Sequence, residues 1–331
     1  MSRQKDTDYL FISTRLRSLE NRLLTRERME RMLEARSNED AAKVLSECGY
    51  EGLEPLSAAA LERSLAANRR DTFAELSSMA PNPGIVDVFR MKYDYHNAKA
   101  LVKCMATGQD PQRLLIDAGR VSADRFREMV QRGELGELPD MLRRGVEEAQ
   151  EKLSATGDPQ RCDFTLDLYY YEELRQVAER SGSSFLQGYV RLMIDAANLK
   201  SAVRLLRMKK GAELSGTVLM EGGNVSKTSV AAAVNTGSAL APVFTGPLQE
   251  AASLGDAIVK GGRQTAFEKA CDDALNAYLQ SSRLTPFGDC VLVAYAAAKE
   301  NEITAARIIL SGRLSGVPTA SIRERLRDAY V

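Results

Sequence analysis

One short pattern recurs three times along this chain and constrains its fold more than any other feature. Each copy is an aliphatic residue, then a hydroxyl residue, then apolar residues spaced as on one face of a helix. The copies begin at Leu24, Val121 and Val225, which lie 97 and 104 residues apart. The hydroxyl residue is suited to cap the helix that follows it.

A second pattern repeats with nearly the same period. In each copy an asparagine is followed six residues later by a basic residue, giving Asn97 with Lys103, Asn198 with Arg204 and Asn301 with Arg307. The asparagines lie 101 and 103 residues apart. A shared period of roughly 100 residues is longer than the 20–50 residues of solenoid repeats and is the size of a small domain. We therefore predict three repeated subdomains, 1–112, 113–215 and 216–331, arranged about a pseudo-threefold axis.

The apolar residues follow helical spacing rather than strand alternation. Tyr9, Ile12, Leu16, Leu19 and Leu23 fall at steps of three or four, which places them on one helix face. Similar stripes surround each of the three asparagines, and short β-like alternation is scarce. The sequence predicts an all-α fold. Glycines at 108, 211 and 312 are the expected C-terminal stops of the three asparagine-bearing helices.

Composition narrows the classes of function. Lys plus Arg and Asp plus Glu both number 45, and this balance disfavours a general nucleic-acid binder, which normally carries a basic excess. The five cysteines are scattered and lack a C-x-x-C pair, as in reduced cytosolic proteins. The N-terminus lacks an apolar leader segment. The longest apolar run, Cys290 to Ala298, is shorter than the roughly 20 residues of a spanning helix.

No combination of residues in the sequence indicates catalysis. His96 is the only histidine, so a multi-histidine metal site and a Ser/His/Asp site with a second supporting histidine are excluded. The segment Gly222–Thr228 resembles a phosphate-binding loop, but Glu221 and Ser226 stand where that motif requires glycine. We expect no catalytic residue, cofactor, metal or small-molecule substrate.

Several polar and glycine positions share the period of the repeat. A carboxylate and an amide stand one turn apart in the first two copies, and we expect them to satisfy backbone groups or bind a base where helices meet. The third copy has Ala298 in place of the aspartate, with Glu302 directly after the asparagine. The repeat positions are Asp94, Asn97, Gly119, Asp195, Asn198, Gly223, Asn301 and Glu302.

Basic residues on the asparagine-bearing helices are the candidate partner-binding groups: Lys99, Lys103, Lys200, Arg204, Arg207 and Arg307. Two interpretations remain open. Either equivalent helices present these bases to an acidic partner, or the bases lie on solvated faces and pair with nearby acids. We predict that at least three line the inner wall or rim of a common cavity.

The C-terminal residues carry a family resemblance. The stretches Tyr295–Ile303 and Gly312–Pro318, with the final Tyr330-Val331, closely resemble the end of the C subunit of the prokaryotic V/A-type ATP synthase. The eukaryotic relative of that protein is the d subunit of the vacuolar ATPase. The opening from Tyr9 to Arg15 is similar to the N-terminus of that family, and the two D-x-x-N segments look like its internal ones.

This resemblance implies a funnel-shaped, non-catalytic subunit of a rotary motor. The funnel would lie on the cytoplasmic face of the membrane and rest on the proteolipid ring as a peripheral subunit. Its open side would receive the central-shaft subunits, linking ion transport, such as hydrogen ion transport, to ATP synthesis or hydrolysis. The alternative from another class is a free-standing helical scaffold or adaptor unconnected with a membrane motor.

Overall fold

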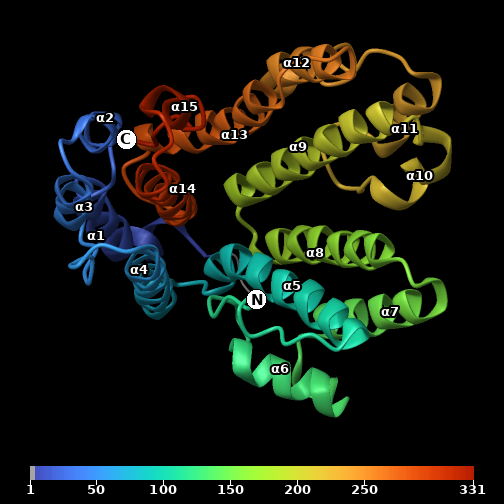
Figure 1. Cartoon of the computed structure of the whole chain (residues 1–331), viewed down its shortest axis with the longest axis horizontal. Helices are drawn as coiled ribbons and strands as arrows, with labels where there is room; N and C mark the ends of the chain where they lie inside the picture. Colours follow the sequence, from blue (N-terminus) through green and yellow to red (C-terminus); the bar gives the residue numbers. More distant parts are fainter. Residues whose placement is uncertain (1–3) are drawn as a thin grey trace.

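The computed structural model describes residues 4–331, and every regular element within that range is a helix (Figure 1). The prediction of an all-α fold is therefore confirmed. Two short 3-10 helices, η1 (Asp6–Tyr9) and η4 (Ser281–Leu284), precede α1 and α14, and two others lie at Leu135–Glu137 and Gly246–Leu248.

One set of helices, here the terminal group, brings together the two ends of the chain. Its members are α1 (Leu10–Glu20), α2 (Arg26–Glu34), α3 (Asn38–Glu47), α4 (Ala58–Met79), α14 (Asp289–Leu314) and α15 (Thr319–Arg323). Side chains from α2, α3 and α4 share one buried core with Ile303, Ile309 and Leu310 of α14. Helices from the two ends of the chain therefore share one core, on the left of Figure 1.

Two further groups make up the rest of the molecule. The middle group contains α5 (Gly84–Thr107), α6 (Ala123–Arg132), α7 (Asp140–Thr156) and α8 (Pro159–Ser181). The α9 group contains α9 (Ser184–Met208), α10 (Gly211–Val218), α11 (Lys227–Thr236), α12 (Gln249–Val259) and α13 (Gln264–Gln280). The largest buried core lies in the middle group and also takes in α1 and the start of α14, so it joins elements of separate groups.

The helices that carry Asn97, Asn198 and Asn301, here the Asn helices, pack across the sequence repeat. Helix α5 lies against α7 and α8, and α9 lies against α12 and α13. Helix α14 has no later repeat to pack on, and it lies instead against α2, α3 and α4 at the start of the chain. The subdomain limits at 112 and 215, and the pseudo-threefold axis, stay predictions.

The expected helix stops need correction at two of three positions. Gly108 does end α5 in the left-handed conformation, with φ of 68°. Helix α9 ends earlier, because Lys209 takes that conformation with φ of 54°, and Gly211 begins α10. Gly312 lies inside α14, where a Cβ would come within 2.8 Å of Ile322, so its role there is close packing on α15.

Candidate interaction site

The first D-x-x-N segment ties α5 to the loop that precedes α6. Asp94 is fully buried, and its Oδ1 accepts from the backbone N–H of Val121 at 3.2 Å while Arg120 Nε donates to its Oδ2 at 2.7 Å. The Asn97 amide both donates to the carbonyl of Ile116 and accepts from its N–H, each at 2.8 Å. Burial raises the pKa of Asp94, although the charge of Arg120 opposes that rise.

The second segment repeats this geometry on α9. Asp195 Oδ1 accepts from the Val225 N–H at 3.0 Å, and the Asn198 amide exchanges two 2.8 Å hydrogen bonds with the backbone of Met220. Glycine is required beside both aspartates, because a Cβ at Gly119 would overlap Asp94 and one at Gly223 would overlap Asp195. In both copies the repeat positions therefore lie close together, because the aspartate and the asparagine of the helix bind the loop that contains the glycine.

The third copy uses a different carboxylate. Asn301 contacts Asn276 of α13 instead of a loop backbone. Glu302 Oε2 accepts from the N–H of Leu24 at 2.6 Å, and its other oxygen accepts from Tyr50 and Lys299. Leu24 opens the first pattern just as Val121 and Val225 do. Each Asn helix therefore binds the backbone two residues before another helix, which is α6, α11 or α2, and in the third copy this bond joins α14 to the N-terminal part of the chain.

Four of the six candidate bases already pair with acids on the neighbouring helix. The pairs are Lys99–Asp167 at 2.5 Å, Lys103–Asp163 at 2.9 Å, Lys200–Asp272 at 2.9 Å and Arg307–Glu62 at 2.8 Å. These side chains are a quarter to a half exposed, so each pair contributes little to stability. In these four pairs, however, the positive charge that was a candidate for binding a partner is already opposed by an acid of the same chain.

Arg204 and Arg207 differ from these four. Both are exposed on α9, and neither forms an ion pair with any residue between 4 and 331. Together with Lys200 they line a cleft of about 600 Å³ between α9 and α13. The structure thus brings three of the six predicted residues to one site, while the bases of α5 and α14 lie elsewhere.

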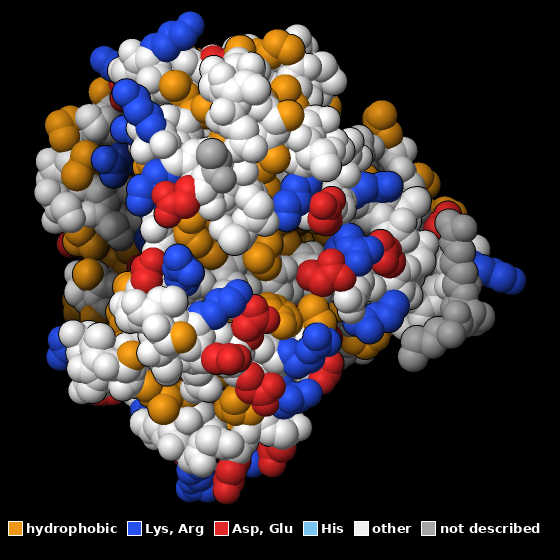
Figure 2. Space-filling view, turned by 90° about the vertical axis from the view of Figure 1, so that its right-hand side faces the viewer, with side chains coloured by type: hydrophobic (Ala, Val, Ile, Leu, Met, Phe, Trp, Pro, Cys, Tyr) orange, Lys and Arg blue, Asp and Glu red, His pale blue; other side chains and the backbone are white. Residues whose placement is uncertain are grey.

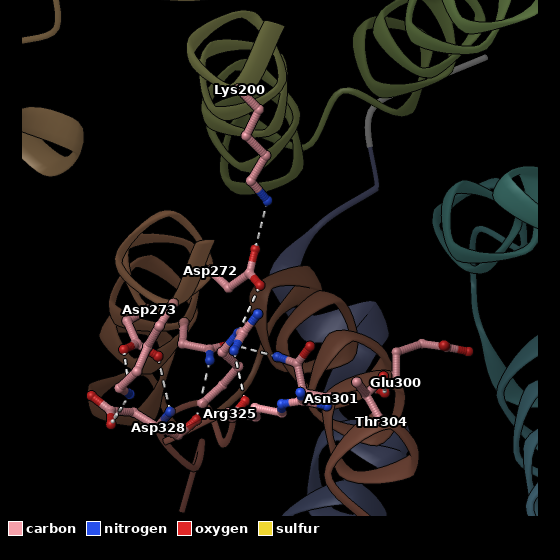
Figure 3. A network of polar contacts seen from close by, with 11 residues as sticks. Lys200, Asp272, Asp273, Glu300, Asn301, Thr304, Arg325 and Asp328 are labelled. Carbon is pink, nitrogen blue, oxygen red and sulfur yellow. Dashed lines mark hydrogen bonds and ion pairs between the residues drawn. The ribbon is translucent and has the colours of Figure 1, made fainter. Parts of the chain in front are cut away.

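Lys200 belongs to a polar network that fixes the C-terminal tail (Figure 3). Asp272 on α13 accepts from Lys200 of α9 and, at 2.8 Å, from Arg327 of the tail. The tail is also held by the backbone N–H of Asp328, which donates to Asp273 at 2.9 Å. One carboxylate therefore connects α9, α13 and the tail.

Sequence reasoning missed a charged cluster that is centred on the buried carboxylate of Glu300. Glu300 on α14 accepts from Arg69 of α4 at 3.2 Å, and from Lys92 and Tyr93 of α5 at 2.7 and 2.6 Å. Burial raises the pKa of Glu300, but the charges of Lys92 and Arg69 outweigh it and hold the pKa below its ordinary value of 4.5. Its only sequence signal was its position beside Asn301. Its partners lie more than 200 residues away in the sequence, so no local sequence pattern could identify them.

Charged side chains and possible metal ligands are dispersed in the part of the chain that the structure describes. Figure 2 shows acidic and basic side chains interspersed over one face, as expected for balanced charge. In residues 4–331, no three His, Cys, Asp or Glu side chains are grouped to hold a metal ion. The helices of the described chain also include none long and apolar enough to cross a membrane.

Comparison with known proteins identifies the family of this chain. The model of the ATP synthase (C/AC39) subunit matches residues 12–325, almost the whole chain. The chain belongs to this family. It is therefore a subunit of a V/A-type rotary ATPase assembly, with a structural rather than a catalytic role, as the C-terminal resemblance predicted.

Individual members of the C/AC39 family align along their full length. The chain is 25% identical to the C subunit of the V-type sodium ATPase of Enterococcus hirae, over 98% of this chain and 99% of that protein. It is 24% identical to the C subunit of the V-type ATP synthase of Deinococcus radiodurans, covering 97% and 91% of the two chains. For the C subunit of the A-type ATP synthase of Pyrococcus abyssi the identity is 23%, with 98% and 91% covered.

Proposed function

We propose that this C/AC39 subunit is the socket that links the central shaft of its ATPase to the membrane proteolipid ring. It would sit on the cytoplasmic side as a peripheral subunit, with three subdomains, 1–112, 113–215 and 216–331, around a pseudo-threefold axis. In that position it transmits rotation, so that ion transport is coupled to ATP synthesis or hydrolysis. Family membership supports this role over a free-standing scaffold or adaptor.

The observation that carries the proposal is the cross-repeat packing of the Asn helices. A socket under torque fails if its subdomains can move independently. Here α14 of the terminal group packs on α5 of the middle group and on α9, and Glu300 of α14 accepts hydrogen bonds from Lys92 and Tyr93 of α5. Load applied to one helix group therefore passes to another through buried contacts rather than through a single linker.

The test is reconstitution of the rotary complex with and without this chain. With it, we expect the shaft and the proteolipid ring to copurify, and ATP hydrolysis to drive ion uptake into vesicles. Without it, the soluble head should still hydrolyse ATP, while ion uptake is lost. Full ion pumping by a complex lacking the chain would contradict the proposal, as would ATP hydrolysis by the purified chain alone.

A further inference from the structure

Two of the three repeats close the same ion pair between an Asn helix and its neighbour. The base six residues after the asparagine meets the fifth residue of the adjacent helix. Lys103 of α5 reaches Asp163, the fifth residue of α8, at 2.9 Å. Arg307 of α14 reaches Glu62, the fifth residue of α4, at 2.8 Å.

The remaining repeat has both partners, yet the pair is open. Arg204 is six residues after Asn198 on α9, and Glu268 is the fifth residue of α13. Glu268 instead accepts a hydrogen bond from Gln264 at 2.7 Å. Arg204 forms no ion pair with any residue of 4–331, and it faces Glu268 across the cleft that both line. In two repeats an ion pair fills the space between the helices. In the repeat of α9 and α13, a cleft lies at the corresponding place.

The lining of this α9–α13 cleft combines positive charge with apolar surface. Lys200, Arg204 and Arg207 face one acid, Glu268, and Lys200 is already bonded to Asp272. Of the apolar lining residues, Val203 and Phe267 are each 4% exposed, and Met208 is 39% exposed. The two free guanidinium groups suit planar carboxylates, which they can bind through paired hydrogen bonds.

We infer that the α9–α13 cleft binds an acidic segment of the central-shaft subunits, through Arg204 and Arg207, with one apolar side chain of that segment packed on Met208. This inference rests on the proposed function, because it assumes assembly with partner subunits. Carboxylates would supply the contacts that Asp163 and Glu62 supply within the chain, while the apolar side chain anchors the segment.

A protein segment fits the cleft better than two other anionic partners. Lipid phosphates could bind the arginines, but lipid acyl chains need a broad apolar surface, and Met208 is the one exposed apolar residue that lines the cleft. A nucleic acid requires an extended basic surface, whereas this chain has equal numbers of acidic and basic residues. Three bases at one cleft are too few for that mode.

The first experiment measures binding of the purified central-shaft subunits by calorimetry at about 50 and 300 mM salt. The double variant Arg204→Glu/Arg207→Glu should bind on the order of tenfold more weakly at low salt, with a reduced salt dependence. The variant Glu268→Gln should bind severalfold more tightly, because it removes repulsion of the incoming carboxylates. The matched control Arg113→Glu/Arg132→Glu changes two exposed arginines elsewhere and should bind as wild type.

The second experiment places a photo-crosslinking residue at 208 in the affinity-purified complex. A crosslink to a partner segment rich in Asp and Glu supports the inference. A crosslink to a basic or uncharged segment overturns it, and so does the absence of any crosslink. Binding to vesicles of equal parts phosphatidylglycerol and phosphatidylcholine that is lost in the double variant would assign the cleft to lipid instead.

The two proposals fail in distinguishable ways. If wild type binds the shaft and the double variant binds equally well, the cleft assignment is wrong while the coupling role stands. If wild type does not bind the shaft at all, the coupling role is in doubt, and the crosslink at 208 decides the cleft independently.

Discussion

At the scale of single residues, buried carboxylates organise this C/AC39 subunit. Asp94 and Asp195 each accept a hydrogen bond from the backbone just before α6 and α11, respectively. Glu302 accepts the corresponding bond from Leu24, just before α2. The sequence identified these positions because the D-x-x-N spacing recurs. It did not predict that Glu302 would replace the missing aspartate at Ala298, because only the packing of α14 on α2 brings Leu24 within reach.

Glu300 makes the stability of the protein sensitive to acid. Its folded pKa lies below the ordinary 4.5, so its contribution is fully present above that pH and is lost as pH falls through the lower folded value. Glu300→Gln should lower the free energy of unfolding by about 3 kcal/mol at pH 7, because it leaves Arg69 buried without a counter-charge.

Urea unfolding at pH 7, 5 and 3.5 tests this prediction. The difference between wild type and Glu300→Gln should be the same at pH 7 and 5 and should shrink at 3.5. A control, Glu75→Gln, removes an exposed ion pair with Arg15 and should cost less than about 1 kcal/mol throughout. A constant difference down to pH 3.5 would contradict the assignment of the shift to Glu300.

Gly223 is predicted to be intolerant of a side chain. A Cβ there would overlap Asp195 Oδ1 and displace the carboxylate from the Val225 N–H. We expect Gly223→Ala to destabilise the protein by about 2 kcal/mol in urea unfolding. Gly216→Ala is the matched control, since its Cβ would meet no atom within 4 Å inside α10, and it should be neutral or slightly stabilising. Equal stability of the two variants would refute this account.

At the scale of helices, the sequence predicted that the elements are helices more accurately than it predicted the residues at which they end. The spacing of apolar residues predicted the helices because the buried face of a helix recurs every three or four residues. The ends at Gly211 and Gly312 were wrong because Lys209 terminates α9 and because α15 packs on Gly312. The partners of Lys103 and Arg307 lie 60 and 245 residues away, so no local pattern could name them.

The three hydroxyl residues expected to cap helices provide a test at this scale, because only two of them do so. The side chains of Thr25 and Ser226 accept from the third backbone N–H of α2 and α11. Ser122 makes no such bond, and at the start of α6 it is the Ala123 N–H that donates to a side chain, that of Asp117. Ser226→Ala should therefore cost about 1 kcal/mol of unfolding free energy, and Ser122→Ala should cost much less. Comparable losses from both would show that cap geometry does not control these helices.

At the scale of the whole molecule, the C-terminal tail closes the arrangement. Tyr330 is 5% exposed and donates to Glu20 of α1, while Arg327 and Asp328 bind Asp272 and Asp273 of α13. The tail thus connects the first helix of the chain to the α9 group. This closure adds to the packing of the Asn helices, of which α9 lies against α12 and α13, and α14 against α2, α3 and α4.

Removal of residues 327–331 should therefore loosen two distant elements together. We expect hydrogen exchange of amides in α1 and α13 to rise on the order of tenfold, since both lose buried or charged contacts with the tail. Amides in α6 and α7 serve as internal controls, because the hydrogen bonds of Arg327, Asp328 and Tyr330 do not reach those helices. The point variant Arg325→Ala, on an exposed side chain of the same segment, should leave all four helices unchanged. Faster exchange in α13 alone would mean that the tail stabilises one helix without joining it to the N-terminus, and the closure would then rest on α14 and Glu302.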